Sequence, residues 1–264
     1  MMNTKLKLLI KLIPGAQKLN LLMLQKKLQN QFLRLNETEQ SQLAFYSQFI
    51  KKGDLVFDVG ANVGSRSKLF LNLGAKVVAF EPQPELHEHL TQHLRLHKRF
   101  TPMPIGLGSK PSVVELKISD AHVLSSMSNR WIKSTTQSGR FSSYNWDKSI
   151  DVKVDTLDNM LTKFSAPKFI KIDVEGYELE VLEGLSYPVQ YLSLEFTSED
   201  IENFKKCLFR IKEIGNYIFQ FSECETLKMS FKYWMDGEAI LKSLESKIKT
   251  QPLLWGDIYC RLER

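Results

Sequence analysis

The sequence has few cysteines and no long apolar run, and each scarcity excludes a class of protein. Its 264 residues include three cysteines, and no two of them form a Cys-x-x-Cys pair. We therefore expect neither a disulfide framework nor a cysteine zinc site, and a reducing, cytoplasmic compartment is indicated. No apolar run reaches the roughly 18 residues of a membrane-spanning helix. No small-x-small cleavage pattern follows a hydrophobic stretch, so a signal peptide is not expected.

Acidic residues are absent from the first 35 positions, which hold seven lysines and arginines. The net charge of +6 resides there, because the remaining chain has 29 basic and 30 acidic residues. A nearly neutral body does not favour a nucleic-acid partner. Pro14-Gly15 would divide the arm into helices over 5–13 and 18–35. We interpret residues 1–50 as a basic amphipathic helical segment and 51–264 as the main domain.

Two roles remain open for this basic arm. Its leucines could pack on the domain or on a second subunit, leaving the lysines in solvent. Alternatively, residues 1–35 could lie on an anionic membrane surface, which would make the protein peripheral to the membrane. The oligomeric state is not readable from the sequence.

Short apolar runs alternate with helical patterns along most of the chain. Strands are predicted at 54–59, 75–82, 101–109, 166–176, 191–196, 217–221 and 257–262. Helices are predicted at 37–50, 65–72, 84–98, 177–184 and 199–214, with no obvious helix immediately before the last strand. This alternation predicts an α/β fold with a doubly wound sheet of about seven strands.

The segment from Asp58 to Gly64 predicts a nucleotide-binding turn between the first strand and its helix. Gly60 and Gly64 would allow unusual backbone dihedral angles and close approach to a ligand. Glu81 ends the next strand 21 residues after Gly60, near the spacing at which an acid binds ribose hydroxyls. A NAD-dependent oxidoreductase would use similar parts. However, Asn62 occupies the position where a second glycine admits a pyrophosphate, which favours a ligand without phosphates.

Asp173, Glu175 and Glu195 follow the apolar cores of two later strands. Strand ends of such a sheet meet at the ligand-binding edge, so these carboxylates are candidates for accepting a proton from an acceptor hydroxyl. Asp173 is the leading candidate, although it could instead cap the helix that follows. Two carboxylates could hold a divalent ion, but no third ligand is evident, and we predict no metal.

Two segments carry side chains whose use the sequence leaves open. Residues 119–149 combine nine serines with four aromatic residues, as in loops that grip a sugar, but they could also form a mobile surface loop. They separate two predicted antiparallel strands at 113–119 and 150–157. The helix at 84–98 holds His89, His93 and His97, which we interpret as a solvated face, because the His-Glu-x-x-His pattern of zinc proteases is not present.

The chain resembles the FkbM-type methyltransferase family. The resemblance depends on four segments and covers residues 54 to about 196: Asp58-Val59-Gly60-Ala61-Asn62-Val63-Gly64, Ala79-Phe80-Glu81-Pro82, Val154-Asp155-Thr156-Leu157-Asp158, and the segment from Phe169 through Ile172-Asp173-Val174-Glu175-Gly176 to Gly184. The closing Trp255 to Tyr259 resembles the terminal strand of the family.

This resemblance implies an S-adenosylmethionine-dependent methyltransferase with a seven-stranded sheet whose last strand is antiparallel. The implied cofactor residues are Asp58, Gly60, Asn62, Gly64, Glu81, Leu107 and Asp173, with Asp173 and Glu175 beside the transferring methyl group. Leu107 would flank the adenine. We predict O-methylation of a sugar, glycan or secondary-metabolite hydroxyl. A catalytically inactive cofactor-binding module in a membrane-associated glycan assembly is the alternative from another class.

Overall fold

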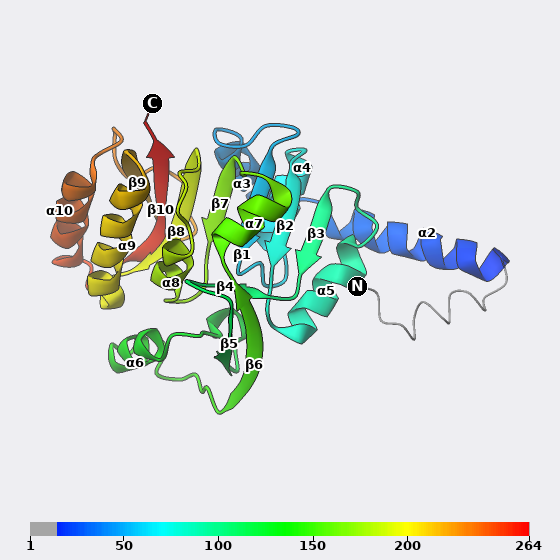
Figure 1. The fold of residues 1–264 in the computed structure, drawn as a ribbon, viewed down its shortest axis with the longest axis horizontal. Helices are drawn as coiled ribbons and strands as arrows, with labels where there is room; N and C mark the ends of the chain where they lie inside the picture. Colours follow the sequence, from blue (N-terminus) through cyan, green and yellow to red (C-terminus); the bar gives the residue numbers. More distant parts are fainter. Residues whose placement is uncertain (1–14, 264) are drawn as a thin grey trace.

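The computed structural model describes residues 15–263, and Figure 1 shows a helix-flanked sheet with one helix projecting at the N-terminal side. The helix predicted over 5–13 lies outside the described residues. The projecting helix is α2 (Gly15–Phe32), followed by α3 (Glu37–Tyr46). Asn36 begins α3 with a capping box, because its side chain accepts from the Glu39 N–H while Glu39 accepts from the Asn36 N–H.

Within the described residues, seven strands form one sheet in the order β3-β2-β1-β7-β8-β10-β9. Their bounds are β1 (Leu55–Val59), β2 (Lys76–Phe80), β3 (Phe100–Met103), β7 (Phe169–Ile172), β8 (Tyr191–Thr197), β9 (Tyr217–Glu223) and β10 (Trp255–Leu262). The strand β10 runs antiparallel to both of its neighbours, whereas β1, β2, β3, β7 and β8 are parallel. The predicted doubly wound sheet with an antiparallel last strand is confirmed.

Helices cover both faces of this sheet: α4 (Ser65–Asn72), α5 (Pro84–Leu94), α7 (Leu157–Phe164), α8 (Glu178–Glu183), α9 (Ile201–Ile214) and α10 (Gly237–Ile248). The expectation that no clear helix precedes the last strand was wrong, because α10 lies there. Asp236 begins α10 by accepting from the Glu238 and Ala239 N–H groups. Ile240 and Leu244, four residues apart, are buried against the core, so both a cap and an apolar spacing were present in the sequence.

A second, three-stranded sheet lies below the first in Figure 1, with β6 (Lys148–Asp155) between β4 (Gly106–Leu107) and β5 (Ser112–Ile118). The strands β5 and β6 are antiparallel, as predicted. Residues 119–149 connect them through a short 3-10 turn, η1 (His122–Leu124), and the helix α6 (Asn129–Gln137). This segment is therefore partly helical.

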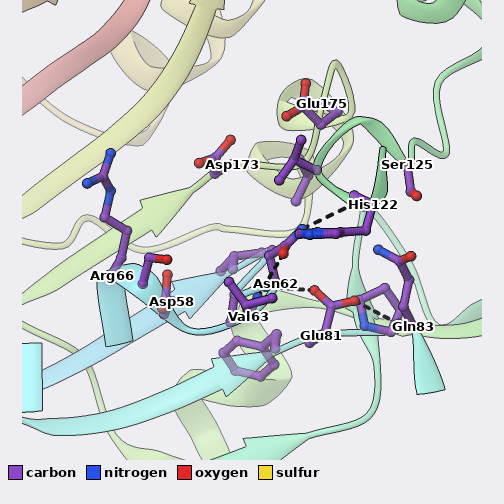
Figure 2. Close-up of a pocket in the computed structure, with 18 of the residues that line it drawn as sticks. Asp58, Asn62, Val63, Arg66, Glu81, Gln83, His122, Ser125, Asp173 and Glu175 are labelled. Atoms are coloured by element: carbon purple, nitrogen blue, oxygen red, sulfur yellow. Dashed lines mark hydrogen bonds between the residues drawn. The ribbon is translucent and has the colours of Figure 1, made fainter. Parts of the chain in front are cut away.

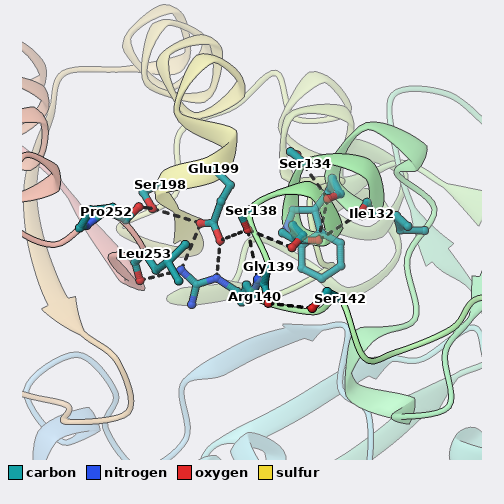
Figure 3. A network of polar contacts seen from close by, with 12 residues as sticks. Ile132, Ser134, Ser138, Gly139, Arg140, Ser142, Ser198, Glu199, Pro252 and Leu253 are labelled. Atoms are coloured by element: carbon teal, nitrogen blue, oxygen red, sulfur yellow. Dashed lines mark hydrogen bonds and ion pairs between the residues drawn. The ribbon is translucent and has the colours of Figure 1, made fainter.

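The insert 119–149 is held to the domain by a polar network around Arg140 (Figure 3). The Arg140 guanidinium donates from Nε and Nη2 to the two carboxylate oxygens of Glu199, at 2.5 and 3.1 Å, and from Nη2 to the Leu253 carbonyl at 2.6 Å. Ser138 donates to the same carboxylate at 3.2 Å. Segments far apart in sequence are thus joined by side chains with little exposure.

The apolar core continues from the sheet into α3. Tyr46, Phe49 and Ile50 are almost fully buried and pack with Phe169 and Tyr259. The boundary predicted at residue 50, between the helical segment and the main domain, remains a prediction. The apolar side chains on its two sides pack in one continuous cluster.

The histidine-rich helix α5 is covered by α2. The ring of Phe32 lies 5.2 Å from that of His93 and 6.3 Å from that of His89. His97 follows the end of the helix, and these rings are only partly exposed. The interpretation of a freely solvated histidine face was therefore wrong, because α2 packs on it. Among residues 15–263, no helix has the length and apolar character to cross a bilayer.

Candidate active site

The turn after β1 forms the floor of a pocket of about 400 Å³ (Figure 2). The backbone φ angles of Gly60, Asn62 and Gly64 are +79°, +50° and +87°. A Cβ on Gly60 would lie 1.8 Å from the Asp173 carbonyl oxygen at the end of β7. Glycine is required at that position because two neighbouring strands approach each other there.

Glu81 fastens this turn from the end of β2. Its Oε2 accepts from the Asn62 N–H and its Oε1 from the Gln83 N–H, each at 2.8 Å. The side chain lines the pocket with only 2% of the residue exposed, and burial raises the pKa of Glu81 to about 7. Each carboxylate oxygen has a second lone pair, so Glu81 can accept further hydrogen bonds from a ligand.

Asp58 and Gly64 flank the turn on its other sides. Asp58 is buried, accepts from the Ser67 hydroxyl at 2.6 Å and lines the pocket, and burial raises the pKa of Asp58. Gly64 begins α4 and does not belong to the pocket lining. A Cβ on Gly64 would instead lie 2.5 Å from Leu90 of α5. The structure thus shows a packing reason for this glycine, and its predicted cofactor contact stays a prediction.

Apolar side chains of the smaller sheet and the insert form the pocket wall beyond Glu81. Leu107 is fully buried and lines the pocket together with Leu116 and Met127. Ser125 and His122 border the same end, where the Asn62 amide donates to the His122 carbonyl at 3.3 Å. This wall can pack against a flat apolar ring, as predicted for Leu107.

Three carboxylates converge at the strand ends opposite that wall. Asp173, Glu175 and Glu195 each have a carboxylate oxygen within 4.8 Å of the others. The expectation that no third potential ligand is evident was therefore wrong, because pairing of β7 with β8 brings Glu195 beside the other two. The absence of a metal remains a prediction, since acidic groups also converge where they share protons.

Burial is the main influence on the ionisation of Glu175 and Glu195. Burial raises the pKa of the Glu175 carboxyl well above its ordinary value, and the neighbouring charge of Glu195 adds to the effect. The pKa of Glu195 is also raised by burial and then by Asp173. Raised pKa values favour the protonated form of these carboxyls, and two carboxyls that share a proton are suited to proton transfer with a reacting group.

Lys171 is a buried cation that the sequence interpretation missed. Its Nζ lies 3.0 Å from Oδ2 of Asp173 and 2.9 Å from Oδ1 of Asp257. Burial opposes the charge, but these two carboxylates raise the pKa of Lys171 well above its ordinary value. A lysine within a fully buried strand, two residues before an acid on the same face, was the available signal. Lys171 holds the Asp173 carboxylate at the pocket rim.

The insert fixes the loop that carries Glu175. Ser126 donates to the Glu175 carbonyl at 2.6 Å, and Arg130 donates to the Gly176 carbonyl at 2.9 Å. Trp131 is buried against Gly176, where a Cβ would lie 2.2 Å from the tryptophan Cβ. The aromatic side chains were interpreted as a possible sugar-gripping surface, but Trp131 serves as packing beneath the acidic loop.

Comparison with known proteins agrees with these features. The model of a family described as "Methyltransferase FkbM domain" matches residues 58–235. The hexuronic acid methyltransferase AglP of Haloferax volcanii is 28% identical over 155 residues, which are 58% of this chain and 58% of that protein. The chain thus aligns with less than two thirds of that relative.

Solved structures that are similar to this chain are distant from it in sequence. Fibrillarin from Aeropyrum pernix, with natively bound S-adenosyl-L-methionine, has a TM-score of 0.45 and 10% identity, covering 83% of this chain and 74% of that one. Precorrin-6y C5,15-methyltransferase from Geobacter metallireducens has a TM-score of 0.44 and 11% identity, covering 83% and 86%.

Proposed function

The chain belongs to the FkbM methyltransferase family, and we propose that it transfers a methyl group from S-adenosylmethionine to a hydroxyl of a sugar or related metabolite. The observation that carries this proposal is the meeting of the Asp58–Asn62 turn, Glu81 and the Asp173–Glu175 acids around one pocket. Its volume of about 400 Å³ lies in the range of ~300–1,000 Å³ that is usual for small-molecule sites.

The residues present fit this cofactor. Glu81 would accept from the ribose hydroxyls, Leu107 would pack on the adenine, and Asp58 and Asn62 would support the methionine end. The carboxylate of Asp173 would attract the cationic amino group of the methionine part. When bound, the cofactor supplies an electrophilic methyl carbon on a sulfonium, and the protein must orient the acceptor and exclude water.

Glu175 and Glu195 are proposed to receive the acceptor proton. An alcohol has a high pKa, so a carboxylate within hydrogen-bond reach assists as the oxygen forms its new bond to carbon. Asp173, held by Lys171, would orient the acceptor and the cofactor amino group beside that pair. Asp173→Ala should abolish turnover, whereas Glu81→Ala should mainly weaken cofactor binding. Unchanged turnover in the first variant would remove Asp173 from the mechanism.

A sugar-type acceptor is supported by the relative from Haloferax volcanii, which is named for a hexuronic acid. Family membership argues against the NAD-dependent oxidoreductase. Isothermal titration with S-adenosylhomocysteine and with NAD separates the two, and the methyltransferase proposal predicts heat with the former only. If S-adenosylhomocysteine gives no heat, the proposal fails. An inactive module would bind it but transfer no methyl group to a panel of glycans.

Peripheral membrane contact through residues 1–35 is a separate proposal. The outward side of α2 exposes Leu19, Met23 and Leu24 by 53–61% and carries Lys26 and Lys27. A surface that is both apolar and cationic favours an anionic bilayer. The double variant Lys26→Glu, Lys27→Glu should lose sedimentation with phosphatidylserine vesicles while keeping its unfolding midpoint. Undiminished sedimentation would contradict the proposal.

A further inference from the structure

One end of the pocket is not explained by the cofactor groups described above. It is lined by polar side chains from the α2–α3 connection, from α3, from α4 and from the loop after β9: Asn36, Thr38, Glu39, Gln42, Arg66 and Glu225. Figure 2 shows Arg66 at the end of the pocket away from Glu81 and Gln83.

Arg66 is a mostly buried cation with few partners. Its side chain is 14% exposed, and within residues 15–263 its hydrogen bonding consists of one contact, from Nη2 to Oε2 of Glu225 at 2.5 Å. A guanidinium carries five N–H donors, so most of the donors of Arg66 have no hydrogen-bond partner among the described residues. The remaining donors are therefore available to a ligand in the pocket that Arg66 lines.

The partner of Arg66 is suited to exchange. The Glu225 side chain is 60% exposed and lies in the loop between β9 and α10, directly after Cys224, whose φ is +52°. Because an exposed carboxylate keeps most of its hydration, it loses little when another carboxylate replaces it. Arginine binds carboxylates with two parallel hydrogen bonds, which the present single contact does not provide.

We propose that Arg66 is a carboxylate-binding residue of this pocket, and that an incoming carboxylate replaces Glu225. This inference rests on the proposed function. Two sources have the required chemistry: the methionine carboxylate of the cofactor and the carboxylate of an acidic sugar acceptor. Both would place a planar anion on Arg66 at the far end of the pocket from Glu81.

The cofactor source is tested by titration calorimetry with S-adenosylhomocysteine and with 5′-methylthioadenosine, which has no carboxylate. If the methionine carboxylate binds Arg66, Arg66→Gln should weaken the former at least tenfold and change the latter less than twofold. Equal losses with both compounds would instead indicate a disturbed pocket and would overturn the proposal.

The acceptor source is tested by titrating glucuronate, with glucose as the neutral control, into the complex with S-adenosylhomocysteine. If an acceptor carboxylate binds Arg66, the wild-type complex should bind glucuronate in preference to glucose. Arg66→Gln should then remove that preference and leave the affinity for S-adenosylhomocysteine unchanged. The proposal is wrong if Arg66→Gln alters the affinity for neither S-adenosylhomocysteine nor glucuronate.

Glu225→Gln is the matched control because it removes the competing carboxylate and leaves Arg66 in position. Carboxylate binding at Arg66 predicts equal or tighter binding in this variant, the opposite of Arg66→Gln. A purely structural ion pair predicts weaker binding in both, and that result would overturn the inference. Arg66→Lys replaces Arg66→Gln if the latter does not fold. Lysine keeps the charge but cannot form the two parallel hydrogen bonds of a guanidinium. If the wild-type protein binds neither adenosine compound, the proposed function fails, rather than the role of Arg66.

Discussion

Among the described residues, two arginines of similar burial differ in the number of hydrogen bonds that their guanidinium groups make, which is three for Arg140 and one for Arg66. Arg140 has 13% and Arg66 has 14% of its side chain exposed. Arg140 binds Glu199, which is only 5% exposed, through both carboxylate oxygens, and it also reaches a backbone carbonyl. Arg66 has one contact with a carboxylate that is 60% exposed. A buried cation that binds both oxygens of a buried carboxylate holds structure in place, whereas one with a single contact to an exposed carboxylate at a pocket wall can receive a ligand.

The difference extends to the two sides of the pocket. The insert side is fastened by Arg140, Trp131 and Ser126, all of which contact residues distant in sequence. On the other side, the first turn of α4 and the loop after β9 contact each other through Arg66 and Glu225. We therefore expect substitutions on the insert side to act on stability and those at Arg66 to act on binding.

The largest effect is expected for Trp131→Ala, which leaves a cavity against Gly176 on the insert side. Truncation of a buried tryptophan should lower the free energy of unfolding by about 4 kcal/mol. Urea unfolding followed by circular dichroism measures this loss. Tyr144→Ala is the control, because Tyr144 lies in the same insert with 39% exposure and should change stability by less than about 1 kcal/mol. Similar losses in both variants would contradict the distinction.

The next effect concerns the two ion pairs directly. Glu199→Gln should lower the free energy of unfolding by about 3 kcal/mol, because it leaves the Arg140 charge uncompensated in a nearly buried setting. Glu225→Gln should cost less than about 1 kcal/mol, since the Glu225 side chain is 60% exposed and solvent screens its attraction for Arg66. Urea unfolding of the two variants under one condition makes the comparison. If Glu225→Gln costs as much as Glu199→Gln, the Arg66 pair is structural.

A smaller effect is expected from the ionisation of Glu81. Burial raises the pKa of its carboxyl to about 7. If the ionised carboxylate binds ribose hydroxyls, the competent fraction rises with pH through that value. The affinity for S-adenosylhomocysteine should therefore increase about tenfold from pH 6 to pH 8 and level off above. Calorimetry at several pH values tests this, and Glu81→Gln should remove the slope. A slope that persists in Glu81→Gln would assign the effect to another acid, such as Asp58.

The smallest effect is expected for Ser126→Ala, which removes the hydrogen bond donated to the Glu175 carbonyl and the one accepted from the Ser128 N–H. The loss in unfolding free energy should be about 1 kcal/mol. Because Glu175 is proposed to sit beside the acceptor, kcat should fall several-fold while the affinity for S-adenosylhomocysteine stays constant. Ser142→Ala, at an exposed serine of the same insert, is the matched control for both measurements. A loss of affinity for S-adenosylhomocysteine in Ser126→Ala would contradict a role of Ser126 beside the acceptor.

Local patterns predicted most of the framework. The helix α4 has the predicted bounds, because Gly64 begins it and the apolar residues 69–71 face the core. The antiparallel pair β5 and β6 followed from alternation of apolar and polar residues. The helix α10 was not predicted, although its Asp236 cap and the spacing of Ile240 and Leu244 are both local signals. The covering of His93 by Phe32 depends on how α2 lies, which no local pattern encodes.

The sequence by itself determined the glycine turn, the acid at the end of β2 and the family. These depend on backbone dihedral angles and on spacings within one βαβ unit, which neighbouring residues specify. Only the tertiary structure decided that Lys171 joins Asp173 to Asp257, that Glu195 completes the acidic group, and that within residues 15–263 the guanidinium of Arg140 makes three hydrogen bonds while that of Arg66 makes one. The satisfaction of a buried charge depends on partners up to 159 positions away in the chain, and those partners meet only when the sheet and its loops have folded.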